Sequence, residues 1–134
     1  MTQYPEEVAY LWQRAASSLE AAAVLIERGL ADAVANRAYY AVFYAVSALF
    51  LTEGESFPKH TAVRAHLHKV YVKPGRLPQE VGSIYDSLFA LRDVGDYGVS
   101  KHVNTAEAKE AITEARRLLE AVRELLPSGV LDQH

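Results

Sequence analysis

The chain has 134 residues, half of them hydrophobic, with a net charge of −3, a pI near 5.9 and no cysteine. The length and apolar content predict one domain with a packed core, and the lack of cysteine excludes disulfides, thiolate metal sites and cysteine nucleophiles. The mild negative charge argues against a protein that coats nucleic acid nonspecifically, and the absence of a basic-then-apolar N-terminal signal and of a long uninterrupted apolar run predicts a soluble, cytoplasmic protein with no membrane span.

Two long helices are predicted in the first half of the chain. Apolar residues recur three and four apart over residues 5–28, and Gly29 stands where that helix should end. A second and more apolar helix is predicted over residues 32–53, with Asp32 as its N-cap and Gly54 as its stop. A short turn between them makes these two helices antiparallel neighbours.

The middle of the chain predicts a short helix followed by a long one. The short helix begins near His60 or Thr61 and ends before "KPGRLP", where two prolines and a glycine break the chain. The long helix covers about 78–94, and "GDYGVSKHV" after it is predicted to be a loop.

The last helix carries the clearest start signal in the sequence. Asn104 can cap the helix with its side chain while Glu107 completes a capping box, and the helix should end before Pro127. No hairpin pattern or internal repeat is present. The prediction is an all-α, up-and-down antiparallel bundle of four long helices plus one shorter helix, as a single domain over 1–134 with its core in about 5–126 and a frayed tail over 127–134.

The second helix is apolar on both sides. One stripe, assigned to the core, comprises Ala35, Tyr39, Val42, Val46 and Leu49. The opposite side surrounds Arg37, the one charged residue between Asp32 and Glu53, with Ala33, Tyr40, Ala41, Tyr44, Ala48 and Leu51. Another helix of the same domain could cover this side, but a second subunit is favoured because few helices remain, with Ala41 and Ala48 permitting close approach.

A buried arginine needs a partner for its charge. One interpretation of Arg37 is an ion pair with Asp93, Asp96 or an acid of the first helix. The other is a phosphate ligand in a cleft where two such helices meet. Sequence physics alone favours the ion pair.

Three stretches in a fixed order resemble the HEPN domain family, namely "RAYYAVF", "KHTAV" followed by "VYVK", and "RDVGDYG". The resemblance covers about residues 6–126 and implies a helical bundle. Many members are metal-independent ribonucleases or toxins that use an arginine followed after four to six residues by a histidine, completed across a homodimer. Others act beside a minimal nucleotidyltransferase in paired modules that include toxin–antitoxin systems.

Carried onto this chain, the arginine of the family motif is Arg37 and the histidine position falls at Tyr44. The two positions share a helix face, so the motif geometry is kept. A tyrosine with an ordinary pKa of about 10 is a poor general base, which favours binding over cleavage. His60, in the family-like "KHTAV", could approach the cleft and replace the missing base, or could merely cap or hydrogen-bond locally.

A segment without acids between Glu55 and Glu80 supplies local positive charge. With Arg37 and Tyr40, it provides the predicted RNA- or nucleotide-binding residues Lys59, Arg64, Lys69 and Lys73, whereas the alternative is a solvated face balanced by acids elsewhere. A zinc site is disfavoured because His60, His66 and His68 would not converge on one helix face. Arg92 and Asp96, four residues apart, are predicted to form a structural ion pair.

Three functions follow in order of preference. The first is a dimeric HEPN-like binding or regulatory protein, without a cofactor or metal, that acts with a nucleotidyltransferase partner and binds RNA or nucleotide phosphates around Arg37. The second is an endoribonuclease in which Arg37 stabilises the transition-state phosphate and His60 or Tyr44 handles the proton. The third is a purely structural bundle in which Arg37 only bridges helices.

Overall fold

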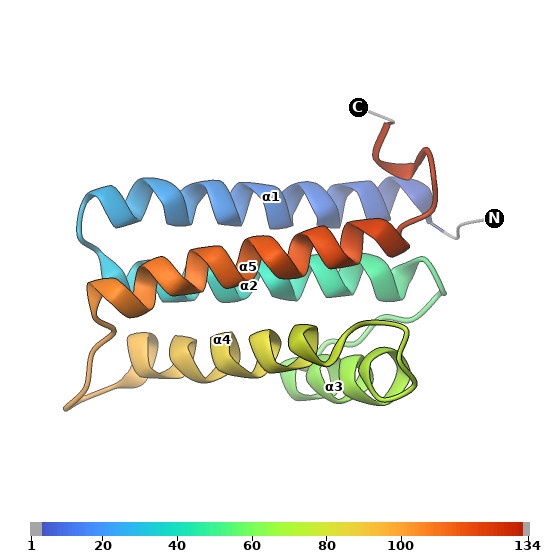
Figure 1. Cartoon of the computed structure of the whole chain (residues 1–134). Helices are drawn as coiled ribbons and strands as arrows, with labels where there is room; N and C mark the ends of the chain where they lie inside the picture. Colours follow the sequence, from blue (N-terminus) through green and yellow to red (C-terminus); the bar gives the residue numbers. More distant parts are fainter. Residues whose placement is uncertain (1–3, 133–134) are drawn as a thin grey trace.

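The computed structural model describes residues 4–132, in which the regular structure is helical (Figure 1). Long helices that follow one another in the chain run antiparallel, and the first long helix begins at the end of the bundle where the last one ends. The predicted all-α bundle of four long helices and one shorter helix is confirmed. The elements are α1 (Pro5–Glu27), α2 (Ala31–Leu51), α3 (His60–His66) with its continuation as a π-helix, η1 (Leu67–Val72), α4 (Gln79–Tyr97), α5 (Thr105–Leu125) and a final 3₁₀ turn, η2 (Val130–Asp132).

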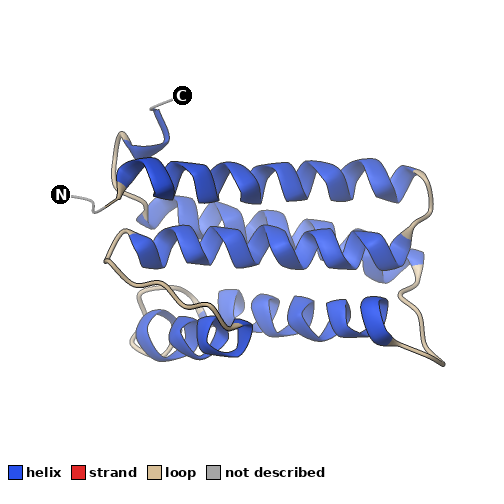
Figure 2. Ribbon diagram, turned by 180° about the vertical axis from the view of Figure 1, so that it is seen from behind, coloured by secondary structure: helices blue, strands red, loops and turns tan. Residues whose placement is uncertain are grey.

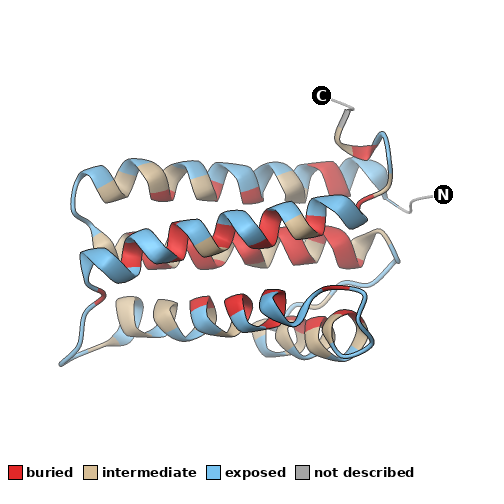
Figure 3. Ribbon diagram, viewed as in Figure 1, coloured by how far each residue is buried: buried red, intermediate tan, exposed pale blue. Residues whose placement is uncertain are grey.

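Helix α2 is the centre of the bundle and packs against α1, α4 and α5 (Figure 2). Its buried face points inward in Figure 3, and every residue of the predicted core stripe is at most 2% exposed. By length and mean hydropathy alone, α2 meets the criteria of a membrane span. Of that apolar segment, 61% is buried inside the bundle, which is the pattern of a core helix.

The prediction that Ala41 and Ala48 permit approach of a second subunit is wrong. Both are fully buried within the chain itself, where α2 meets neighbouring helices. Along one side, α2 keeps a narrow row of half-buried residues, which we call the α2 stripe: Ala33, Asn36, Arg37, Tyr40, Tyr44, Ser47 and Leu51.

The predicted loop after residue 94 is wrong at its start, because α4 continues to Tyr97. A β-carbon on Gly95 would lie 3.0 Å from the backbone oxygen of Asp32. The missing side chain therefore serves a close approach of α4 to α2, and does not end a helix. This approach brings the next residue, Asp96, beside the α2 stripe.

The start of α2 and the C-terminal tail also differ from the sequence predictions. Helix α2 starts after Leu30, and Asp32, predicted as the N-cap, instead accepts hydrogen bonds from the backbone N–H of Val103 at 2.9 Å and from His102. The tail predicted to fray forms η2 as far as Asp132 and buries Val130, while residues 133–134 lie outside the described range. The start of α2 and the η2 turn are both held by residues far away in the sequence, so a local sequence pattern does not reveal them.

Candidate functional site

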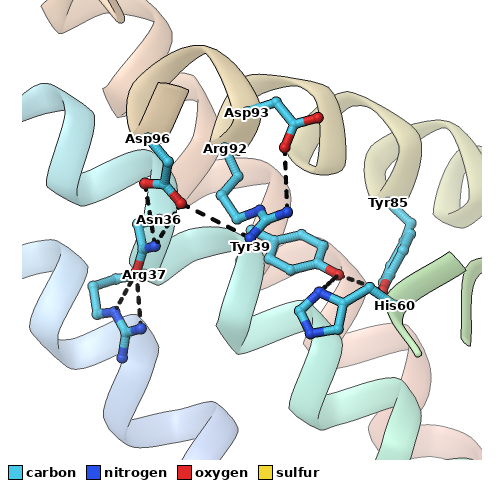
Figure 4. A network of polar contacts seen from close by, with 8 residues as sticks. All are labelled: Asn36, Arg37, Tyr39, His60, Tyr85, Arg92, Asp93 and Asp96. Atoms are coloured by element: carbon cyan, nitrogen blue, oxygen red, sulfur yellow. Dashed lines mark hydrogen bonds and ion pairs between the residues drawn. The ribbon is translucent and has the colours of Figure 1, made fainter. Parts of the chain in front are cut away.

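Arg37 is held by the side chain next to it in the sequence (Figure 4). Its Nε and Nη2 donate to Asn36 Oδ1 at 3.0 and 2.8 Å, and its guanidinium lies 5.1 Å from the ring centroid of Tyr40. Asn36 Nδ2 in turn donates to both carboxylate oxygens of Asp96, at 3.1 and 3.3 Å. An uncharged amide therefore stands between the guanidinium and the carboxylate.

The predicted ion pair of Arg37 with Asp93, Asp96 or an acid of α1 is wrong. Among residues 4–132, Arg37 forms no ion pair. Arg92 forms ion pairs with the nearby carboxylates. Its Nη2 lies 3.2 Å from Asp93 Oδ1, and its Nη1 lies 3.8 Å from Asp96 Oδ2. Arg92 is nearly buried, with its guanidinium 5.0 Å from the ring centroid of Tyr39, and its single positive charge offsets one of these two negative charges.

Arg37 borders two surface hollows of opposite character. The hollow between α2 and α4 has a volume of about 570 Å³ and contains two carboxylates, those of Asp32 and Asp96. The hollow between α1 and α2 has a volume of about 450 Å³, and no carboxylate of the described residues lines it. Its lining residues are Tyr10, Gln13, Arg14, Ser17, Ser18, Ala21 and Arg37.

Tyr44, the position of the family histidine, is engaged by an arginine that sequence reasoning missed. Arg14 Nη2 donates to the Tyr44 hydroxyl at 2.8 Å, and Nη1 donates to the Tyr10 hydroxyl at 3.1 Å. The Arg14 guanidinium also lies 4.7 Å from the Tyr44 ring centroid. The available signal was the spacing of Tyr10 and Arg14, four apart on one face of a predicted helix.

His60 ends a chain of buried hydroxyl groups. The Tyr39 hydroxyl lies 3.0 Å from His60 Nδ1 and 3.2 Å from the Tyr85 hydroxyl, as Figure 4 shows. Burial raises the pKa of both tyrosines, so both phenols keep their protons. Burial, followed by the charge of Arg92, lowers the pKa of His60, so the imidazole is neutral at pH 7.

One arrangement of protons satisfies the whole chain. If Tyr85 donates to Tyr39 and Tyr39 donates to His60 Nδ1, every buried hydroxyl donates a hydrogen bond. The reverse arrangement leaves the buried Tyr85 hydroxyl without an acceptor, which costs about 1–3 kcal/mol. His60 is therefore the tautomer with its proton on Nε2, a nitrogen that has no partner within the described part of the chain.

The structure brings three of the predicted site residues together around a fourth, Tyr40. The Arg37 guanidinium lies on this ring, the His60 ring centroid is 5.7 Å from it and the Tyr44 ring centroid is 5.9 Å from it. Phe43 packs on His60 at 4.4 Å between centroids and fixes the ring. Arg37 and His60 thus flank a common aromatic side chain, although they come from different helices.

The basic segment is partly neutralised by acids. Arg64 donates to Asp86 at 2.7 Å, and Arg76 donates to Glu53 at 2.7 Å. His68 shares the same Asp86. Across residues 4–132, no ion pair involves the three predicted lysines, Lys59, Lys69 and Lys73.

The three histidines of this segment have different neighbours. His60 bonds Tyr39, His66 packs on Phe50 at 4.5 Å between centroids, and His68 bonds an aspartate. No group of three potential metal ligands occurs within the residues that the structure describes.

Comparison with known proteins identifies relatives over nearly the full chain. The profile of the HEPN domain family matches residues 8–125. A UPF0332 protein of Thermotoga maritima is 35% identical over 126 residues, covering 94% of this chain and 96% of the relative. Two proteins of Methanocaldococcus jannaschii are also similar: "Putative toxin MJ0605" is 34% identical over 90% of each chain, and "Putative toxin MJ0142" is 28% identical over 94% of this chain and 86% of the relative.

Proposed function

The chain belongs to the HEPN domain family, and from this premise we propose that it is the HEPN component of a cytoplasmic toxin–antitoxin type module. In this proposal a homodimer of single-domain chains binds phosphate groups of RNA at Arg37 and acts with a nucleotidyltransferase partner. The two relatives named as toxins support the module.

The main support for the proposal is that, within residues 4–132, no carboxylate neutralises the charge of Arg37. The side chain sits in the most apolar helix of the bundle, and within residues 4–132 a neutral amide oxygen is its hydrogen-bond acceptor. An amide orients a guanidinium without neutralising it, so Arg37 keeps its full attraction for an anion. A purely structural arginine would be expected to contact one of the nearby carboxylates directly.

Distance along the bundle favours RNA over a single nucleotide as the ligand. The basic segment follows α2 toward its C-terminal end, because His60 packs on Phe43 whereas Tyr71 stacks on Phe50 at 5.4 Å between centroids. Arg37 and Phe50 are 13 residues apart, which is roughly 20 Å along a helix. A ligand that contacts both Arg37 and the lysines beside Tyr71 in the sequence, Lys69 and Lys73, must therefore be an oligonucleotide.

The α2 stripe is the surface proposed for the dimer, with Arg37 at the edge of the interface in a cleft that stays open to RNA. Its half-buried tyrosines, Tyr40 and Tyr44, are suited to an interface with a polar rim. Sedimentation at micromolar concentration should give the mass of a dimer. A monomer at that concentration would contradict this part of the proposal.

The binding function is tested with a fluorescein-labelled single-stranded RNA in EDTA, followed by anisotropy. Arg37→Gln should weaken binding by roughly tenfold, as expected for loss of one charge-assisted phosphate contact. Arg123→Gln on α5 makes the same charge change away from the α2 stripe and serves as the control. Equal affinities of wild type and Arg37→Gln, with both folded, would refute the binding function and favour the structural bundle.

Endoribonuclease activity is the second candidate, because His60 and Arg37 flank Tyr40. Arg37 would stabilise the charge that develops on the phosphate, and the Nε2–H of His60 would donate to a phosphate oxygen. A role for His60 as base requires the reversed hydroxyl chain and its unsatisfied Tyr85 hydroxyl, which is why binding is preferred.

Cleavage of labelled RNA in EDTA distinguishes the two candidates. Cleavage by wild type that disappears in both Arg37→Ala and His60→Ala would establish the nuclease. Cleavage that appears only in Tyr44→His would indicate a binding cleft that lacks its base. No cleavage by any variant, together with RNA binding that depends on Arg37, supports the binding role.

A further inference from the structure

The hollow between α1 and α2 contains two arginines from different helices. Arg14 comes from the middle of α1 and Arg37 from the second turn of α2, and both line the same space of about 450 Å³. Ser17 and Ser18 add two hydroxyl groups to its wall. Like charges approach one another on a protein surface at a cost, so their shared position in an acidic chain needs a reason.

Neither guanidinium is neutralised within the described part of the chain. Arg14 donates to two tyrosine hydroxyls, Tyr10 and Tyr44, and Arg37 donates to the amide of Asn36. These acceptors are uncharged, so they fix the direction of each guanidinium and leave its charge available. Among residues 4–132, no acceptor faces Nε of Arg14 or Nη1 of Arg37, so each guanidinium keeps a free donor there.

The two hollows beside Arg37 differ in their carboxylates. The hollow on the α4 side of Arg37 contains the carboxylates of Asp32 and Asp96 and would repel an anion. The hollow on the α1 side is lined by none of the carboxylates in residues 4–132. An anion that approaches Arg37 is therefore directed to the α1 side, where Arg14 lies.

The rim supplies an aromatic surface next to the charges. Tyr10 lines the hollow, and its side chain is 56% exposed. An exposed aromatic ring beside two cations matches the chemistry of a nucleic-acid chain, in which a base and a phosphate follow one another. Inorganic phosphate would use the cations and leave the ring unused.

We infer that Arg14 and Arg37 form one phosphodiester-binding site between α1 and α2, which holds the backbone of single-stranded RNA while Tyr10 stacks on a base. The inference rests on the proposed binding function and adds to it a second cation, a base-stacking residue and the face of Arg37 that is used.

The test measures binding of a fluorescein-labelled oligouridylate of about 10 nucleotides, a length within the range that such surfaces cover. Arg14→Gln should weaken binding by roughly tenfold, and the slope of log K against log salt should fall by about 0.7 for one lost phosphate contact. Arg14→Lys keeps the charge and should retain most of the affinity. Tyr10→Ala should weaken RNA binding without changing the salt slope, and competition by inorganic phosphate alone should be weak.

The outcomes separate this site from the general function. If Arg37→Gln weakens binding but Arg14→Gln matches the Arg123→Gln control, the two-arginine site is wrong and the binding function stands. If neither arginine matters, the binding function itself is wrong. Thermal unfolding shows whether each variant is folded. If Arg14→Gln is unstable, the charge-conserving Arg14→Lys replaces it in the test. An Arg14→Lys variant that loses as much affinity as Arg37→Gln would overturn a site based on charge.

Discussion

Replacing Asn36 by aspartate tests whether the uncharged amide keeps Arg37 available. The substitution preserves shape but places a carboxylate 2.8–3.0 Å from the guanidinium and 3.1–3.3 Å from Asp96. Attraction to Arg37 and repulsion from Asp96 act over similar distances and largely offset each other, but the aspartate cannot donate the two hydrogen bonds that Asn36 gives to Asp96. The free energy of unfolding should therefore fall by about 1–3 kcal/mol.

The substitution should also weaken RNA binding. A phosphate on the far side of the Arg37 guanidinium would lie about 6 Å from the new carboxylate, and Coulomb's law gives about 0.7 kcal/mol in water and about 3 kcal/mol at an effective dielectric constant of 20. The midpoint of this range corresponds to a loss of affinity of roughly tenfold to thirtyfold. Raising the salt concentration should shrink the difference.

The assay is RNA anisotropy at fixed ionic strength, with thermal unfolding on the same samples. Asn104→Asp is the matched control, since it makes the same charge change at the N-cap of α5, where aspartate also caps well. Affinity of Asn36→Asp equal to that of this control would refute the argument that the amide matters because it is uncharged.

Three further variants test the packing and the hydrogen bonds described above. Gly95→Ala should destabilise the fold by about 1–3 kcal/mol in urea unfolding, because its β-carbon would crowd the backbone of α2. A tolerated alanine would show that the approach is looser. Tyr39→Phe should cost more stability than Tyr85→Phe, because the first leaves two polar partners unsatisfied and the second leaves none, by a difference of about 1–3 kcal/mol in the same measurement. Hydrogen bonds from an arginine and a tyrosine lower the pKa of Glu53 in the fold from 4.5, so it stabilises the protein above that pH and the contribution is lost as the pH falls through the lowered value. Glu53→Gln should therefore flatten the acid side of a plot of melting temperature against pH, and an unchanged slope would contradict this.

Features set by local sequence were predicted well. The capping box of α5 is present as expected, with Asn104 and Glu107 bonding each other's backbone, because all of its atoms lie within one helical turn. The core stripe of α2 was predicted because its spacing is a property of the helix itself. These features need no knowledge of what packs against them.

Features that depend on distant contacts were missed. Glycine is common in loops, so Gly95 was placed in one, and only the approach of α2 shows that its lack of a side chain serves packing. The partner of Arg37 was assigned to an acid because charge is visible in a sequence, whereas the link through Asn36 to Asp96 joins positions 60 residues apart. Arg14 was overlooked because an arginine on the polar side of a helix is common, and its tyrosine partner on α2 is 30 residues away.

The π-helix η1 has a consequence for how the chain tolerates changes in length. A π-turn contains one residue more than an α-turn, so removing one residue within 67–72 can restore ordinary winding while the flanking segments keep their positions. The same removal from α2 would rotate every following side chain by about 100° and turn the core stripe toward solvent. Length variation among natural homologues should thus concentrate at η1 and spare the central helix.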